Sequence, residues 1–73
     1  MVIHYDLKNN GFVTLKVFDI LGKEIAAIVD GYKTAGSYDA TFLASEYNLS
    51  SGVYFYKLTA GNFTDMKKMT LIK

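Results

Sequence analysis

The sequence contains a single histidine and seven acidic residues, the side chains that could supply acid–base or metal chemistry in a chain without cysteine. His4 lies on the polar side of a short alternating stretch that runs from Ile3 to Leu7. A Ser-His-Asp arrangement would need His4 to be oriented by a buried acid such as Asp6. Residues two apart on a strand point the same way without clasping each other, so the sequence favours an exposed histidine without a catalytic role.

The acidic residues do not have the spacing of a metal site. They are scattered over turns and polar faces, without the dense carboxylates of a calcium loop. A calcium ion held by Asp19 or Asp30 with backbone carbonyls stays open as a minor alternative. Gly31 and Gly36 do not lie between a strand and a helix, where a phosphate loop would need them. The sequence therefore predicts no catalytic residue, no metal ligand and no cofactor.

Three phenylalanines fall on the opposite side of their strands from the expected core. Phe12, Phe18 and Phe55 have Lys16 and Lys57 beside them, a combination that suits stacking on bases or sugars. In so thin a domain, long aromatic side chains also serve to cover edges and loops. We favour this second interpretation.

The elements that position these side chains follow from a period-two alternation of apolar and polar residues. Gly61-Asn62 predicts a two-residue hairpin turn, because both residues tolerate positive φ. Broken alternation near Ala26-Ala27 predicts a β-bulge. A seventh strand could form around Tyr32-Lys33. One helical turn is possible between residues 43 and 48, although no helix is supported there. Strands are expected at residues 3–7, 12–19, 24–30, 37–42, 53–59 and from the hairpin turn to residue 73.

Short strands separated by turn signals indicate an all-β fold. Too few strands are available for a closed barrel with a cavity. We expect residues 1–73 to form one small immunoglobulin-like antiparallel β-sandwich of six to seven strands. The expected core is Ile3, Tyr5, Leu7, Val13, Leu15, Val17, Ile25, Ile28, Ala40, Phe42, Leu49, Tyr54, Tyr56, Leu58, Met69 and Leu71.

The overall charge and hydropathy exclude several classes of partner. A formal net charge of +1 gives no strong field toward nucleic acid or anionic lipid. No apolar run approaches the ~20 residues of a membrane span, so neither nucleic-acid binding nor membrane insertion is expected. The sequence has no proline, which leaves lysines to protect strand edges and makes weak self-association possible.

Several blocks resemble the type A C-terminal sorting domain of the type IX secretion system of Bacteroidetes and related bacteria. The match is strongest in the last third of the chain, and the order and spacing of the blocks make it specific. An Asn-Pro turn that commonly precedes the first strand in that family is missing here. The blocks are Ile3-x-Tyr5-x-Leu7, Gly11-x-Val13-x-Leu15-x-Val17-Phe18-Asp19-x-x-Gly22-x-Glu24-Ile25, Gly36-x-Tyr38-x-Ala40-x-Phe42, Leu49-Ser50-Ser51-Gly52-Val53-Tyr54-Phe55-Tyr56-Lys57-Leu58 and Lys67-Lys68-Met69-x-Leu71-Ile72-Lys73.

The resemblance implies a non-enzymatic sorting signal that forms the C-terminal piece of a longer secreted protein. Its implied partners are the secretion machinery and the parent cargo domain. Its implied route leads through the periplasm to the outer-membrane surface or the extracellular medium. The terminal strand, with lysines in solvent and apolar anchors toward the core, is the expected recognition segment. The candidate recognition residues are Lys67, Lys68, Met69, Leu71, Lys73, Gly52, Tyr54 and Tyr56.

Two other functions stay open at this point. A passive immunoglobulin-like spacer or carbohydrate-contacting module would also suit a β-sandwich with exposed phenylalanines. A self-assembling structural subunit would suit a proline-free sandwich whose terminal strands can pair with a neighbour.

Overall fold

The computed structural model describes residues 1–72, which form six strands and one short 3-10 helix. The six expected strands are present, although the last one ends at Leu71, and Tyr32-Lys33 closes the third strand instead of forming a seventh. Residues 44–47 make one helical turn, which the sequence left possible. Across residues 1–72, no helix has the length and apolar character needed to cross a bilayer. The elements are β1 (Val2–Leu7), β2 (Gly11–Phe18), β3 (Glu24–Lys33), β4 (Gly36–Thr41), η1 (Ala44–Tyr47), β5 (Gly52–Ala60) and β6 (Phe63–Leu71).

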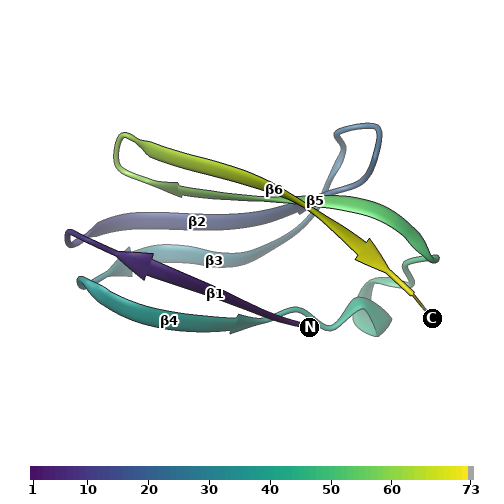
Figure 1. Cartoon of the computed structure of the whole chain (residues 1–73), viewed down its shortest axis with the longest axis horizontal. Helices are drawn as coiled ribbons and strands as arrows, with labels where there is room; N and C mark the ends of the chain where they lie inside the picture. The colour runs from purple at the N-terminus through teal and green to yellow at the C-terminus, as the bar shows by residue number, and fades with distance from the viewer. Residues whose placement is uncertain (73) are drawn as a thin grey trace.

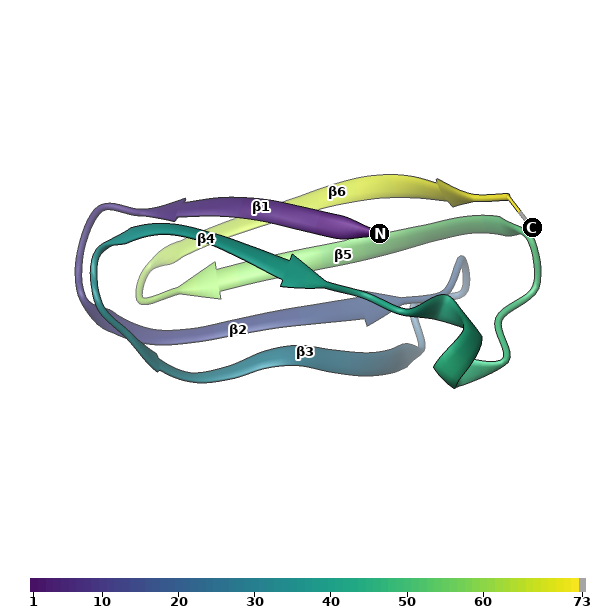
Figure 2. The same cartoon turned by 90° about the horizontal axis from the view of Figure 1, so that it is seen from below.

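Two antiparallel sheets pack face to face as a sandwich (Figures 1 and 2). The smaller sheet contains only β1 and β4, whereas the larger has four strands in the order β3-β2-β5-β6. The chain passes from one sheet to the other after β1, after β3 and after β4. This confirms the predicted all-β sandwich, with six strands in the part of the chain that the structure describes.

The core lies between the sheets and follows the predicted alternation. Val13, Leu15 and Val17 of β2 are the most deeply buried side chains, at 1% exposure or less. They pack against alternate residues of β1, in the opposite sheet, and of β5, the neighbouring strand in the same sheet. All the predicted core residues are either buried or packed against the buried clusters. The sequence missed Ala26, which is also buried.

Two bulges in β3 explain the broken alternation near Ala26-Ala27. Register shifts against β2 leave Ile28 without a partner between Val29 and Ala27, and Ile25 without one between Ala26 and Glu24. An extra residue in one strand turns its neighbours toward the same face. Ile25, Ala26 and Ile28 can therefore all contact the core.

The start of β5 is fixed by a tyrosine corner. Tyr54 is buried, and its hydroxyl donates a 2.7 Å hydrogen bond to the carbonyl of Ser50, four residues upstream. Similar tyrosine corners occur in immunoglobulin-like sandwiches. Gly52 has a φ of 155°, which side chains rarely adopt, and leads the chain into the strand. Leu49 packs against the core before this corner, as the sequence predicts.

Candidate functional site

The predicted recognition segment lies in the β5–β6 hairpin. Ala60 and Phe63 pair across the Gly61-Asn62 turn, so the two-residue turn is confirmed. Gly61 has a φ of 60°, which is favourable only for a residue without a Cβ or for asparagine-like residues. From this turn the two strands pair without a bulge until Gly52 meets Leu71.

The strand β6 ends at Leu71, which corrects the expectation that it continues to residue 73. Pairing stops there because Gly52, the partner of Leu71, is the first residue of β5. Ile72 follows outside the strand and is 85% exposed. Lys73 lies outside the described residues, so its predicted role stays a prediction.

The candidate residues separate into anchors and exposed groups. Met69 and Tyr54 are buried and pair with each other across the hairpin. Leu71, Tyr56 and Gly52 are half-buried, whereas Lys67 and Lys68 are exposed. The predicted division into apolar anchors and solvent-exposed lysines therefore holds for the residues that the structure describes.

The two exposed lysines point to opposite faces of the larger sheet. Lys67 pairs with Tyr56 and shares the inner face with Met69, but it lies beyond the edge of the smaller sheet. Its ammonium group is 4.0 Å from the Asp65 carboxylate. Lys68 pairs with Phe55 on the outer face. The sequence alone gives no reason to separate the two lysines, but the strand alternation shows that a flat partner cannot contact both.

The outer face of the larger sheet joins Lys68 to the phenylalanines noted in the sequence. Phe18 pairs with Phe55, and Lys16 pairs with Lys57 in the next row. Lys16 forms a 3.2 Å ion pair with Glu24. Phe18 and Phe55 are half-buried by these neighbours, whereas Phe12 is 58% exposed. Covering of the sheet therefore accounts for Phe18 and Phe55 and not for Phe12.

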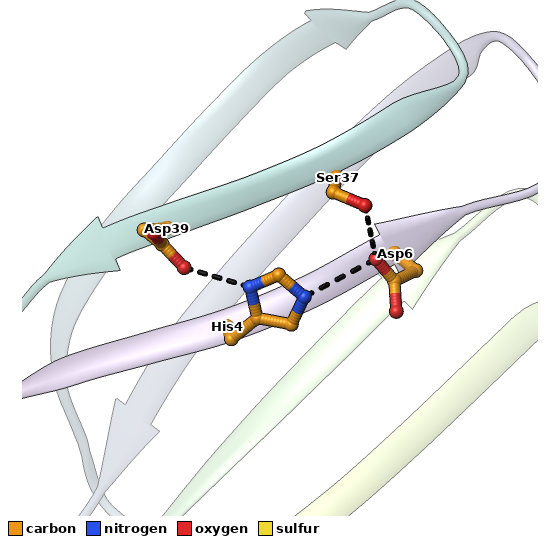
Figure 3. A network of polar contacts seen from close by, with 4 residues as sticks. All are labelled: His4, Asp6, Ser37 and Asp39. Carbon is orange, nitrogen blue, oxygen red and sulfur yellow. Dashed lines mark hydrogen bonds and ion pairs between the residues drawn. The ribbon is translucent and has the colours of Figure 1, made fainter.

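A polar network occupies the outer face of the smaller sheet (Figure 3). His4 Nδ1 is 2.7 Å from the Asp39 carboxylate, and His4 Nε2 is 3.2 Å from Asp6. The Ser37 hydroxyl donates a 2.6 Å hydrogen bond to Asp6. His4 is exposed, as predicted, but the expectation that it does not contact Asp6 is wrong. The sequence missed Asp39 and Ser37 because they lie on a strand whose pairing with β1 no local signal indicates.

This network does not have the arrangement of a hydrolytic triad. The serine hydroxyl contacts an aspartate instead of the histidine, so His4 cannot receive its proton directly. The Asp39 hydrogen bond is the main cause that raises the pKa of His4 above its ordinary value of 6.5. The Ser37 hydrogen bond is the main cause that lowers the pKa of Asp6. The network therefore favours a charged histidine between two carboxylates on the surface.

Asp19, one of the two acids considered for a calcium loop, makes hydrogen bonds within its own turn. One carboxylate oxygen of Asp19 accepts hydrogen bonds of 2.9 Å from the backbone N–H groups of Leu21 and Lys23. These bonds shape the β2–β3 turn. Among residues 1–72, no three metal-ligating side chains gather into a possible ion site.

Fold and surface together define a small immunoglobulin-like β-sandwich whose exposed features are strand edges and charged sheet faces. Such features fit recognition by another protein. The family model described as "Secretion system C-terminal sorting domain" matches residues 1–73, and the chain belongs to this family, which serves type IX secretion. No curated protein matches the chain. No solved structure matches it either.

Proposed function

We propose that the domain is an export signal that directs an attached cargo protein through the type IX secretion machinery to the cell surface. The family supports a sorting role and a secreted cargo. The proposed route passes through the periplasm, and the cargo ends on the outer membrane or in the medium. The partners are proteins of the machinery and the cargo domain, and the signal performs no catalysis.

The hairpin geometry carries the proposal of where the machinery binds. Met69 and Tyr54 hold β6 to the core, while the other edge of β6 has no strand beside it within the described sheet. Lys67 and Lys68 flank this edge on its two faces. A partner that pairs with the edge of β6 therefore has a cation above and below its own strand. This arrangement combines backbone pairing with charge recognition.

The test uses a reporter protein fused in front of the domain in a bacterium that has type IX secretion. Lys67→Gln and Lys68→Gln are introduced singly and together, and surface reporter is compared with periplasmic reporter. Substitution of exposed charges changes stability by less than about 0.5 kcal/mol, so the fold should stay intact. We expect the double variant to accumulate in the periplasm, and each single variant to show a smaller defect.

Two exposed lysines outside β5 and β6 provide a charge-matched control. Lys8→Gln with Lys23→Gln removes the same charge and leaves β6 unchanged. We expect this control to be exported like the parent. Normal export of the double β6 variant, with an unchanged melting temperature, would show that the lysines are not recognised. An equal defect in both double variants would point to net charge instead of a site.

A further inference from the structure

A groove runs along the edge of β1 that faces away from β4. Ile3 and Tyr5 of β1 form one wall, and Phe63, Asp65 and Lys67 of β6 form the other. Figure 2 shows β1 and β6 along the same side of the molecule, with β2 and β3 on the opposite side. The floor contains Leu15, Tyr56 and Leu58, and the groove has a volume of about 330 Å³.

The groove continues past Asp6 to a larger hollow near the β5–β6 turn. Asp6, Leu58 and Phe63 line both spaces, and the second has a volume of about 710 Å³. Phe63 is 52% exposed, and Tyr56 and Leu58 are only half-buried. An apolar strip therefore lies open beside β1 from Ile3 to Leu7.

The backbone hydrogen bonds of β1 show which of its groups face the groove. The Met1 nitrogen donates a 3.0 Å hydrogen bond to the Phe42 carbonyl, and the Phe42 N–H donates a 2.8 Å bond to the Met1 carbonyl. Met1 and Phe42 are therefore a hydrogen-bonded pair, from which the other bonded pairs of β1 and β4 can be counted. Bonded and non-bonded pairs alternate along such a ladder. By the register, Ile3, Tyr5 and Leu7 bond to β4. The N–H and C=O groups of Val2, His4 and Asp6 are therefore directed toward the groove.

An immunoglobulin-like fold has room for another strand at this position. In immunoglobulin domains, the sheet that corresponds to the smaller sheet here has four strands, with one beside the strand that β1 represents. Here that sheet has two. A strand edge is usually protected by lysine, proline or a bulge. The six residues of β1 contain neither of these residues, and its pairing with β4 has no bulge.

The shape of the groove favours an extended segment over a second folded copy. The β5–β6 hairpin projects on the side of the free edge of β1. If two copies paired through β1, their two hairpins would occupy the same space. A single strand of about 20 Å matches the six residues of β1 and leaves the hairpin in place.

We propose that β1 binds an extended segment of a partner polypeptide as an additional antiparallel strand. Antiparallel pairing is the orientation of every strand pair in the described sheets. Alternate apolar residues of the segment pack on Tyr56, Leu58 and Phe63. A basic residue between them lies opposite Asp6, which complements the Asp6 and Asp39 carboxylates on that face. The strand edge that this site uses is separate from the free edge of β6, although Lys67 lines one wall of the groove, and the site does not depend on the proposed export function.

The probe is a short labelled peptide of alternating valine and lysine, blocked at both ends, with binding followed by fluorescence anisotropy. When the valines point into the groove, the lysines lie opposite His4 and Asp6 and point outward with them. The lysine amides then bond to the free backbone groups of β1, and the valine amides face away from β1. We expect N-methylation of the lysine amides to weaken binding at least about tenfold, because these hydrogen bonds are lost. N-methylation of the valine amides should have a much smaller effect. Equal loss with both peptides, or no binding of the unmethylated peptide, would overturn the proposal.

Protein variants provide the matched test. His4→Pro removes an N–H that faces the groove and leaves the bonds to β4 intact, whereas His4→Thr keeps that N–H. We expect loss of binding only in His4→Pro. Hydrogen exchange of the parent protein provides a measurement that needs no variant: the amides of Val2, His4 and Asp6 should be protected when the peptide is added. Protection confined to β6, or peptide-induced dimers, would contradict a strand site on β1.

Discussion

His4 Nδ1 lies 2.7 Å from the Asp39 carboxylate, although the residues are 35 positions apart in the chain. The register places them directly opposite each other in β1 and β4. Asp6, two positions along the strand, approaches the other ring nitrogen. The single histidine is therefore held between two carboxylates that belong to the two strands of the smaller sheet.

This arrangement predicts a stability maximum at mildly acidic pH. The pKa of His4 is raised in the folded state, so its contribution is fully present below 6.5 and is lost as pH rises through the folded pKa. The pKa of Asp6 is lowered, so its contribution is present above 3.8 and is lost as pH falls through the folded pKa. Denaturation midpoints measured across this range should be highest between the two ordinary values.

Asp39→Asn should remove most of the loss of stability that follows deprotonation of His4 as pH rises, because Asp39 provides the main hydrogen bond of His4. Asp30→Asn is the control, since Asp30 is an exposed acid outside this network. The measurement is the denaturation midpoint from about pH 5 to about pH 8, where histidine titrates. A decrease of the same size in the Asp39→Asn variant would show that another group controls the pH dependence.

Leu15→Ala should destabilise the domain by about 2–5 kcal/mol, the usual cost of removing a fully buried leucine side chain. Leu15 has 0% exposure and belongs to a core cluster that contains residues of both sheets. Leu21→Ala is the matched control, because Leu21 is 90% exposed at the tip of the β2–β3 turn. Chemical denaturation should separate the two variants clearly. Similar losses in both would contradict the assignment of the inner face of β2.

Gly52→Val should cost about 1–3 kcal/mol, because its φ of 155° is unfavourable for any residue with a Cβ. The loss would arise from backbone strain and not from a clash, since no atom lies within 4 Å of the position of an added Cβ. Gly11→Val has equally open space without the positive φ, so it should change stability much less. Equal midpoints for the two variants would exclude strain at Gly52.

Asp19→Ala should destabilise the domain by about 1 kcal/mol, because two backbone N–H groups lose a charged acceptor at the β2–β3 turn. Asp19→Asn keeps one acceptor oxygen and should recover part of the loss. Thermal melts of the two variants can test this order. A neutral effect of Asp19→Ala would show that solvent replaces the carboxylate without cost.

The strands and most of the core could be predicted because alternation is a local property of the sequence. Ile3, Leu15 and Val17 belong to strands in which buried residues alternate regularly, as the sequence predicts. Ala26 was missed because the bulges on either side of it break the pattern from which a face is assigned. The end of β6 was misplaced because a strand ends where its partner ends, and Gly52 is remote from Leu71 in the sequence.

The candidate site was less accessible from the sequence for the same reason. Lys67 and Lys68 were predicted as candidate recognition residues. That Lys67 lies beside the edge of the smaller sheet depends on how far this sheet extends over β6. The contact between His4 and Asp39 depends on which strand pairs with β1. Neither of these arrangements leaves a periodic signal in the chain.

The pairing of β1 with β4 also has a consequence for the order of folding. The bond between the Met1 nitrogen and the Phe42 carbonyl closes a loop of 41 residues, whereas the β5–β6 hairpin needs only the Gly61-Asn62 turn. Loop-closure entropy makes such distant pairing slow, while hairpins form within about 1–10 μs. We expect the hairpin that bears Lys67 and Lys68 to form early, and β1 to dock late. During that interval an extended segment from elsewhere can compete for either edge of β4.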